Sequence, residues 1–437
     1  MARYLTTPAR LKKTAVLMST GVVLAATVAG CGGSSGGGKQ TGAQAKQTLT
    51  FLNAQDPGTF DVPIKAFEKA HPNITIKKQT VPFDDLNSAI QSRIGAKDTS
   101  IDIVDVDEPR LASFAARGYL ADLTSLRKGA SVDSQAMKVT TYKGKQYAMP
   151  RWTSTQLLFY NKDLLTKAKV APPSSDPSKP ITWEQLTADG KKAQAKGGAR
   201  WGFTFDQVDR YYQLQPLPEG LGGGSGLTGK GNLTPDITNA AWTKAFTWYG
   251  KVFADGISPR GVAPEQTSAL FTSGKSAFFA GGPWNAGAFA AAKTLHFGVA
   301  PYPKFAAGRP ATSTDSWSMA VSAFSKHQAA ATAFIKYITT DPTGAYQSSY
   351  GNIPVQKDAF GKYLGDLRAK GQGQLAAIIQ GALADNPVHR PTTIGYVDFE
   401  TVMNKAFTDI RNGASASQRL QQATQELKRA LKKYQGQ

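Results

Sequence analysis

Short apolar segments and amphipathic segments alternate along the chain after residue 47. Three apolar segments have the length and the turn-forming borders of strands: 48–52, 74–76 and 101–106. Between and behind them, apolar residues return every three or four positions, as at Leu86, Ile90 and Ile94 and again over 111–117, which predicts helices. Strand and helix therefore alternate three times, and this order favours an α/β fold with a parallel sheet covered on both faces.

Helical periodicity dominates the later part of the chain. A helix is predicted to begin at Trp183, because Thr182 is a suitable N-cap and Gln185 stands three residues after it. The stretch 216–235 holds three prolines and a run of glycines and is predicted to be loop. Three later segments have helical spacing of apolar residues: 240–253, 399–410 and 420–434. The two C-terminal helices need a surface to cover, so we expect them to pack on the preceding domain.

The N-terminus has the pattern of an export signal. Four basic residues precede an apolar stretch, 15–28, that is too short to span a bilayer as a helix, which predicts a signal peptide over 1–30. The end of this segment, 28–31, resembles the lipobox of bacterial lipoproteins, whose cysteine receives a diacylglyceryl group. The resemblance implies lipidation at Cys31, a flexible linker over 31–47, and a protein anchored at the extracellular face of the cell membrane. The alternative is a free, buried cysteine.

The charge of the chain is strongly basic. The net charge is +20, and loss of the first 30 residues, which hold four basic and no acidic side chains, would leave +16. The basic residues are spread singly or in pairs, with no basic stripe interleaved with aromatics and no zinc-finger spacing. A solvated basic surface is therefore favoured over nucleic-acid binding. The remaining length suffices for two domains with their own cores.

No motif predicts catalysis or a cofactor. Residues 224–229 match GxGxxG, but prolines on both sides conflict with the strand and helix that a dinucleotide site requires. Residues 33–37 match the spacing of a hydrolase nucleophile elbow but lie in the linker. The four histidines stand far apart in the sequence, so we expect no metal site. We therefore expect no cofactor and no enzymatic activity.

Carboxylates gather at the third predicted strand. Asp107 and Glu108 lie at its carboxyl end, where ligands bind in open α/β sheets, whereas Asp102 and Asp105 lie within the strand segment. Paired carboxylates are what a glycosidase needs. Binding sugar hydroxyls demands less, because an acceptor needs only a fixed position.

Several stretches, taken in their order and spacing, resemble the extracellular solute-binding proteins of ABC sugar importers, family 1, the group that includes maltose-binding protein. The resemblance covers nearly the whole chain after the linker and rests on these stretches: 118–123, 144–150, 158–165, 182–186, 271–278, 282–284, 325–338 and 351–355.

The resemblance implies two α/β lobes with a hinged cleft between them, crossed by the chain near 152–155 and 313–317. Lobe one is then expected over 48–153 and 315–360, and lobe two over 154–314 and 361–437. The implied function is capture of a di- or oligosaccharide and its delivery to the ABC permease by a monomeric receptor. Because closure is a population shift, the sugar must contact both lobes.

The same resemblance suggests ligand-binding residues. Trp284, within Gly-Pro-Trp-Asn, is expected to stack on a pyranose ring, and Trp152 and Trp317 stand in the crossing segments. The segment 315–317 departs from the small, glycine-rich crossing often found in the family, which leaves the length of the sugar open. The other candidates are hydrogen-bonding or aromatic residues near strand ends and crossings: Asn53, Gln55, Asp56, Asp107, Glu108, Arg151, Ser154, Tyr212 and Tyr350.

Three alternatives stay open at this point. The ligand can be a polyol or a sugar phosphate, although a phosphate would need a stronger arginine cluster than Arg110 and Arg151. The protein can be a lipid-anchored glycoside hydrolase that uses Asp107 and Glu108. It can also be a structural adhesin, which would not close on small ligands.

Overall fold

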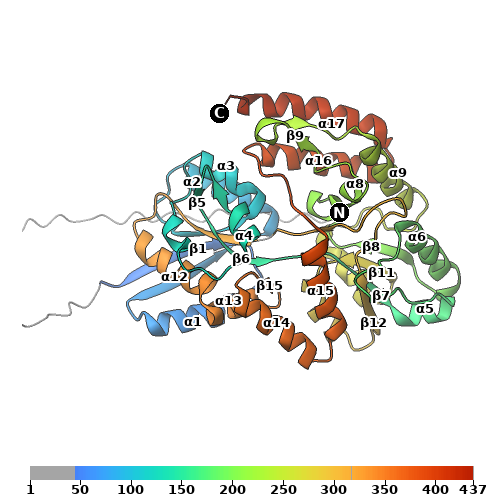
Figure 1. The fold of residues 1–437 in the computed structure, drawn as a ribbon, viewed down its shortest axis with the longest axis horizontal. Helices are drawn as coiled ribbons and strands as arrows, with labels where there is room; N and C mark the ends of the chain where they lie inside the picture. Colours follow the sequence, from blue (N-terminus) through green and yellow to red (C-terminus); the bar gives the residue numbers. More distant parts are fainter. Residues whose placement is uncertain (1–44, 316, 437) are drawn as a thin grey trace, which may run out of the picture. The chain divides into compact units, whose positions relative to one another are not determined.

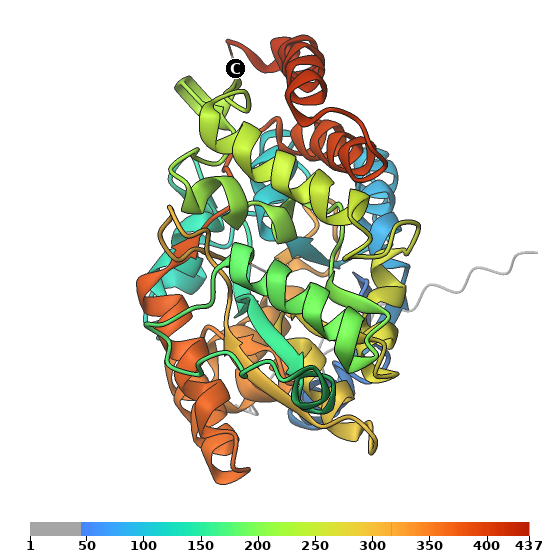
Figure 2. The same cartoon turned by 90° about the vertical axis from the view of Figure 1, so that its right-hand side faces the viewer.

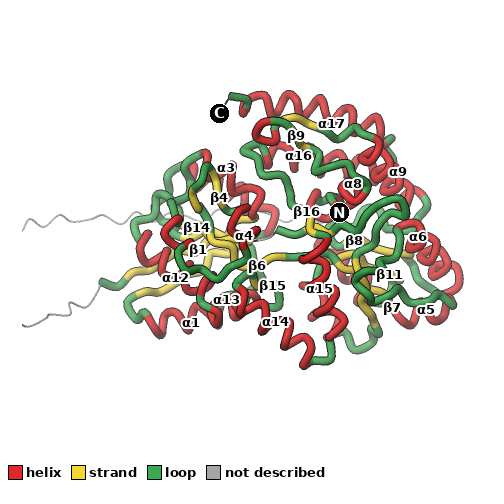
Figure 3. Tube along the Cα trace, in the orientation of Figure 1, coloured by secondary structure: helices red, strands yellow, loops and turns green. Residues whose placement is uncertain are grey.

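The computed structural model describes residues 45–315 and 317–436. Ala45–Gln437 form one compact unit in which the main strands make two sheets with helices around them (Figure 3). Cys31, the predicted signal peptide and most of the predicted linker lie outside the described residues. Within the described part, no helix combines the length and the apolar character that a membrane crossing requires.

The first sheet has six strands in the order β15-β6-β14-β3-β1-β2. Its strands are β1 (Gln47–Asn53), β2 (Ile74–Thr80), β3 (Ile103–Asp107), β6 (Met149–Thr153), β14 (Trp317–Val321) and β15 (Ile353–Pro354). β1 pairs in parallel with β2 and β3, as the alternation of strands and helices predicts. β14 is antiparallel to both β3 and β6, so the sheet is mixed rather than wholly parallel. This strand comes from far along the chain, and local periodicity does not reveal its direction.

Both faces of the six-stranded sheet are covered (Figure 1). The helices of this region are α1 (Asp61–Ala70), α2 (Leu86–Gly95), α3 (Leu111–Ala116), α4 (Ser134–Val139), α12 (Gln328–Thr340) and α13 (Pro342–Ser349). Because side chains alternate across a strand, Phe51 packs with α1 and α12 on one face, whereas Leu52 packs with α2 and α3 on the other. Continuous apolar strands are what burial on both faces requires.

The second sheet has four strands in the order β12-β7-β11-β8. They are β7 (Leu157–Asn161), β8 (Trp201–Phe205), β11 (Ser276–Gly281) and β12 (Phe297–Pro301). β8 and β11 are parallel, and β7 is antiparallel to its two neighbours. The first helices around this sheet are α5 (Lys162–Ala168), α6 (Trp183–Lys192), α7 (Tyr211–Leu214), α8 (Pro216–Gly220), α9 (Ala240–Ala254), α10 (Pro264–Thr272) and α11 (Ala286–Ala291).

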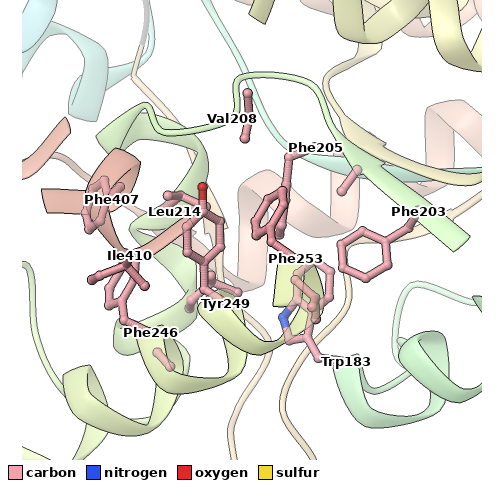
Figure 4. Close-up of a cluster of buried hydrophobic side chains, with 14 of the residues drawn as sticks. Trp183, Phe203, Phe205, Val208, Leu214, Phe246, Tyr249, Phe253, Phe407 and Ile410 are labelled. Atoms are coloured by element: carbon pink, nitrogen blue, oxygen red, sulfur yellow. The ribbon is translucent and has the colours of Figure 1, made fainter. Parts of the chain in front are cut away.

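The C-terminal helices complete the second region. They are α14 (Lys357–Ala369), α15 (Gly373–Asp385), α16 (Tyr396–Arg411) and α17 (Ala416–Leu431). α14 and α15 pack on one face of the four-stranded sheet, while α16 and α17 contact α9 on the other side, which confirms that they cover a preceding surface (Figure 2). Figure 4 shows the resulting core, in which Phe246 and Tyr249 of α9 meet Phe407 and Ile410 of α16 near the aromatic residues of β8.

Short elements lie at the ends and crossings. Small strands pair locally as β4 (Thr141–Tyr142) with β5 (Lys145–Gln146), β9 (Leu227–Thr228) with β10 (Thr234–Pro235), and β13 (Thr312–Ser313) with β16 (Pro387–Val388). Single turns occur at Phe83–Asp85, Glu108–Arg110, Thr124–Arg127, Ala193–Gly197, Lys230–Asn232, Pro283–Asn285 and Lys432–Tyr434.

Two local predictions have different outcomes. The N-cap is confirmed: α6 begins at Trp183 and the Oγ1 of Thr182 accepts a hydrogen bond from the backbone N–H of Gln185 at 3.1 Å. The loop prediction for 216–235 is wrong in part, because α8 and the β9–β10 pair lie within it. Pro216 stands at the first position of α8, where a missing N–H costs nothing.

The chain passes from the first sheet to the second between β6 and β7 and returns between β12 and β14. The predicted crossings near 152–155 and 313–317 lie in these passages. The lobe boundaries drawn there stay a prediction.

Candidate functional site

In each sheet, polar or aromatic residues follow the carboxyl ends of the parallel strands. β1 and β3 end at the same edge of the six-stranded sheet, followed by Gln55 and by Glu108. β8 and β11 end together in the four-stranded sheet, followed by Asp206 and Trp284. The candidates therefore come from the carboxyl ends of strands in both sheets.

Asp105 and Arg151 form an ion pair in the first sheet, with both side chains 0% exposed. The Nη2 of Arg151 lies 3.0 and 3.2 Å from the two carboxylate oxygens, and the guanidinium lies 3.2 Å from the ring centroid of Trp152. Burial lowers the pKa of Arg151 to about 10 against the opposing effect of Asp105, so the guanidinium is charged at neutral pH. The Nε2 of Gln55 donates to Asp105 at 2.6 Å. Arg151, predicted as a donor to ligand, is thus enclosed and positions Gln55 through Asp105.

Asp107, at the end of β3, lies between two arginines. Arg390 donates Nη2 and Nη1 to its two oxygens at 2.7 and 3.0 Å, and Arg110 pairs with it as well as with Glu400 of α16. Burial by itself would raise the pKa of Asp107, but the two arginines outweigh this effect and hold the pKa below its ordinary value. The neighbouring Glu108 is buried and accepts a hydrogen bond from Ser318 at 3.4 Å.

Trp284 is held by a buried carboxylate of the second sheet. Its Nε1–H donates to the Oδ2 of Asp206 at 2.9 Å, and the Nδ2 of Asn285 donates to the same oxygen at 3.0 Å. Burial raises the pKa of Asp206 to about 6, although these two donors oppose the shift. The Trp284 side chain remains partly exposed. The sequence reasoning named Trp284 but missed Asp206 and Asn285, although Asp206 directly follows a strand, as Asp107 ends one.

Ser154 and Tyr212 connect the crossings. The hydroxyl oxygens of Ser154 and Tyr212 lie 2.5 Å apart, and Ser154 also donates to the backbone oxygen of Asp315 at 2.6 Å. The Tyr212 ring lies 6.4 Å from that of Trp284, measured between centroids. His389 lies 2.6 Å from the Oδ1 of Asp315. Burial disfavours the charged ring of His389, yet the interaction with Asp315 raises the pKa of His389 above its ordinary value.

A second set of contacts joins the two regions near Trp317. The Trp317 ring meets Phe83 edge to face, with 5.6 Å between centroids. The guanidinium of Arg210, which follows β8, lies 4.7 Å from the Phe83 centroid and donates to Asp84 at 3.1 Å and to Glu265 at 2.8 Å. Arg210 was also missed, because an arginine in a loop carries no sequence signal of a partner this distant.

The remaining predicted ligand-binding residues differ in whether they are buried or exposed. Asn53 is buried, and its Oδ1 accepts from the N–H of Gln55 at 3.1 Å, which fixes the turn after β1. Asp56 is exposed in that turn, and Trp152 is buried beneath Arg151. Tyr350 is exposed after α13. The structure thus links Ser154 with Tyr212 and Trp284, and Gln55 with Arg151 through Asp105. The hydroxyl of Tyr350 lies beside Gly58, in the turn that carries Gln55.

These contacts suit binding better than bond cleavage. Burial raises the pKa of Asp105 against the opposing effect of Arg151, but the Asp105 oxygens are engaged by Arg151 and Gln55. Asp107 is held between Arg110 and Arg390, so neither carboxylate is free to exchange a proton with a ligand as a general acid must. Among the described residues, no group of three His, Cys, Asp or Glu side chains is arranged to hold a metal ion. What the two sheet edges offer is hydrogen-bond acceptors, N–H donors and aromatic faces.

Comparisons with known proteins show the family of this chain. The profile of bacterial extracellular solute-binding proteins matches residues 64–362. The galactooligosaccharide-binding protein of Bacillus subtilis is 28% identical over 334 residues, covering 72% of this chain and 74% of that protein. The mannitol-binding protein of Pseudomonas aeruginosa is 24% identical over 330 residues, covering 71% and 74%.

Solved structures resemble the fold closely. An ABC substrate-binding protein from Listeria monocytogenes, in complex with cycloalternan, has a TM-score of 0.78 at 24% identity and covers 88% of this chain and 99% of that one. The GacH receptor of Streptomyces glaucescens, studied unliganded and with acarbose, has a TM-score of 0.75 at 25% identity and covers 89% and 99%. The fold is therefore the two-lobed fold of substrate-binding proteins, and the two sheets are the centres of the lobes.

Proposed function

The chain belongs to the bacterial extracellular solute-binding proteins, and from this premise we propose that it is the carbohydrate receptor of an ABC importer. It captures a di- or oligosaccharide between lobe one, built on the six-stranded sheet, and lobe two, built on the four-stranded sheet. It then delivers the sugar, as a monomer, to the membrane permease. It catalyses no reaction on the sugar.

The observation that carries this proposal is the setting of Trp284. A partly exposed indole, oriented through its N–H by the buried Asp206, offers a fixed face to the C–H groups of a pyranose ring. Tyr212 and Asn285 lie beside it and supply hydrogen-bonding groups for hydroxyls. Relatives whose names state galactooligosaccharide and maltodextrin as ligands support the same substrate class.

Residues of lobe one complete the site in this proposal. Gln55 and Asp56 contribute from the turn after β1, and Trp317 contributes from the start of β14. The Trp317 ring meets Phe83, which Arg210 of lobe two contacts in turn, so contacts between the lobes already exist there. A sugar that touches both groups favours the arrangement in which they are close, so closure follows from binding. Asn53, Trp152 and Arg151 act from beneath by holding these residues in place.

A polyol is the second candidate, because one relative is a mannitol-binding protein. A polyol lacks a ring to stack on Trp284. The affinity for a polyol should therefore depend less on that indole than the affinity for a sugar does.

The test is tryptophan fluorescence together with thermal shift on the purified protein. The panel contains mono- and oligosaccharides, polyols, sugar phosphates, amino acids and peptides. A saturable response to one sugar class, with the sugar recovered unchanged by chromatography, is the expected result. A response confined to polyols selects the second candidate, and release of a shorter sugar contradicts the non-catalytic role.

The proposed location rests on Cys31, which we propose is lipidated after removal of residues 1–30. Cys31→Ser should move the protein from the membrane fraction to the soluble fraction without changing sugar affinity. Membrane retention of this variant would rule out the lipid anchor.

A further inference from the structure

A groove with a cavity volume of about 450 Å³ lies next to the loop that carries Trp284. Lobe one lines it with Val62, in the first turn of α1, and with the end of α13 and Tyr350; lobe two lines it with Pro283 and α11. Helices α14 and α15 close it from a third side. A groove shared by both lobes is where a ligand that bridges them can lie.

The groove borders the loops that carry candidate sugar-binding residues on both lobes. Pro283, in its wall, directly precedes Trp284. On the other lobe, the hydroxyl of Tyr350 lies 3.4 Å from the position that a Cβ would take on Gly58, in the turn that carries Gln55 and Asp56. The groove therefore lies beside the loops that follow the carboxyl ends of β1 and β11.

Tyr350 has two properties of a functional aromatic residue. Its side chain is 57% exposed, and with Val62 at 58% it is one of the three large hydrophobic side chains exposed among the described residues. Its φ of 48° lies in the left-handed region, which is uncommon for a bulky residue and costs free energy unless the surroundings hold it there. Tyr350 is the C-cap residue of α13, so this backbone conformation ends the helix and fixes where the exposed ring stands.

The chemistry of the groove matches a sugar ring. Its walls supply apolar and aromatic surface from Val62, Pro283 and Tyr350, while Asp366 and Lys370 at the same groove supply hydrogen-bonding groups. A pyranose presents the same mixture, with C–H faces and a rim of hydroxyls. A few polar groups among apolar walls are typical of sites that fix a small ligand.

We propose that this groove is a subsite for a further sugar unit beyond the one on Trp284, with Tyr350 as its stacking platform. The inference rests on the proposed function and sharpens it: the preferred ligand is an oligosaccharide of three or more units rather than a disaccharide. Short sugars bind at Trp284 alone, and longer ones also occupy the groove.

The test measures affinity by isothermal titration for two series of two to five units, malto-oligosaccharides and galacto-oligosaccharides. For the wild-type protein, affinity should rise once the chain is long enough to reach the groove. Tyr350→Ala should lower affinity for the longer sugars about 3- to 10-fold, as expected for loss of one aromatic stacking contact, and leave the disaccharide within about twofold. Tyr350→Asn, which removes the ring but tolerates the left-handed backbone, should behave in the same way, and Tyr350→Phe should retain the preference.

Tyr142→Ala, at a tyrosine outside the groove, is the matched control and should bind every length as the wild type does. An equal loss for all lengths in Tyr350→Ala, or no length preference in the wild type, would overturn the subsite while leaving the sugar receptor intact. Failure of every sugar in both series to bind the wild type would instead overturn the proposed function and the subsite with it.

Discussion

Asp107 and Asp206 occupy corresponding places in the two lobes, yet they are stabilised by different chemistry. Each is a buried carboxylate at the carboxyl end of a parallel strand. Asp107 is paired with the full charges of Arg110 and Arg390, whereas Asp206 accepts hydrogen bonds from the neutral side chains of Trp284 and Asn285. The pKa of Asp107 is lowered, and that of Asp206 is raised to about 6.

Because their partners differ, Asp107 and Asp206 have different roles in the molecule. Ion pairs connect Asp107 of lobe one to Arg390 and, through Arg110, to Glu400 of α16, and both partners stand in the part of the chain assigned to lobe two. In lobe two, neutral donors leave the carboxylate poorly compensated, but they orient an aromatic ring at the surface. The charged groups around Asp107 thus join segments from both lobes, whereas the neutral groups around Asp206 hold an aromatic ring at the surface.

The largest expected effect comes from breaking the ion pairs of Asp107. Arg390→Met leaves Asp107 buried with one fewer cation and should lower the free energy of unfolding by about 3–5 kcal/mol, as for other broken buried pairs. Urea denaturation at pH 7 measures this loss. The control is Lys145→Met, which removes an exposed pair with Asp122 and should leave the free energy of unfolding nearly unchanged, because water screens such a pair. Equal losses in the two variants would show that the Asp107 network is not structural.

The next largest expected effect is on stability as a function of pH, to which Asp107 and Asp206 should contribute in opposite directions. Asp107 has a lowered pKa, so its contribution to stability is present above the unfolded value of 3.8 and is lost as pH falls through the folded pKa. Asp206 has a raised pKa, so its contribution is present below 3.8 and is lost as pH rises through about 6. The shift of Asp206 corresponds to about 3 kcal/mol across that window.

Urea denaturation between pH 4 and pH 8 tests whether stability changes with pH in the direction expected for each carboxylate. Relative to the wild type, Asp206→Asn should lose less stability as pH rises from 4 to 7, because the group that must ionise in a buried place is gone. Asp107→Asn, the matched variant in lobe one, should not reduce that loss. Identical pH slopes for the wild type and Asp206→Asn would contradict the raised pKa of Asp206.

The sequence predicts the elements and the kind of site better than the partners within it. Strand and helix periodicity locates β1, β2, β3 and α2 because each depends on its own apolar spacing. The antiparallel insertion of β14 depends on pairing with strands far away in sequence, which local patterns do not encode. For the same reason, Trp284 is recognisable from its local motif, whereas Asp206, Arg210 and Arg390 become visible only when the chain brings them to their partners.

The burial of Arg151 is a related case. An arginine at a crossing segment is equally compatible with binding a ligand and with pairing to a buried carboxylate, and the sequence does not show that Asp105 faces it. Arg151 stands on β6 and Asp105 on β3, and β14 lies between these two strands in the sheet. Whether the Arg151 side chain is exposed therefore depends on a strand distant in sequence and not on its neighbours along the chain.

The smallest expected effect is on sugar affinity and sharpens the role of lobe two. Trp284→Ala should weaken binding of the saccharide found in the fluorescence panel by about 1–3 kcal/mol, the value of burying one large apolar side chain, with a smaller change in the free energy of unfolding because the indole is partly exposed. Trp201→Ala, at the other end of the strand that precedes Asp206, is the control and should leave affinity unchanged. If Asp206 serves to orient the indole, Asp206→Asn should fall between the wild type and Trp284→Ala in isothermal titration. Wild-type affinity in Trp284→Ala would remove the indole from the site and, with it, the reason for burying an uncompensated carboxylate in lobe two.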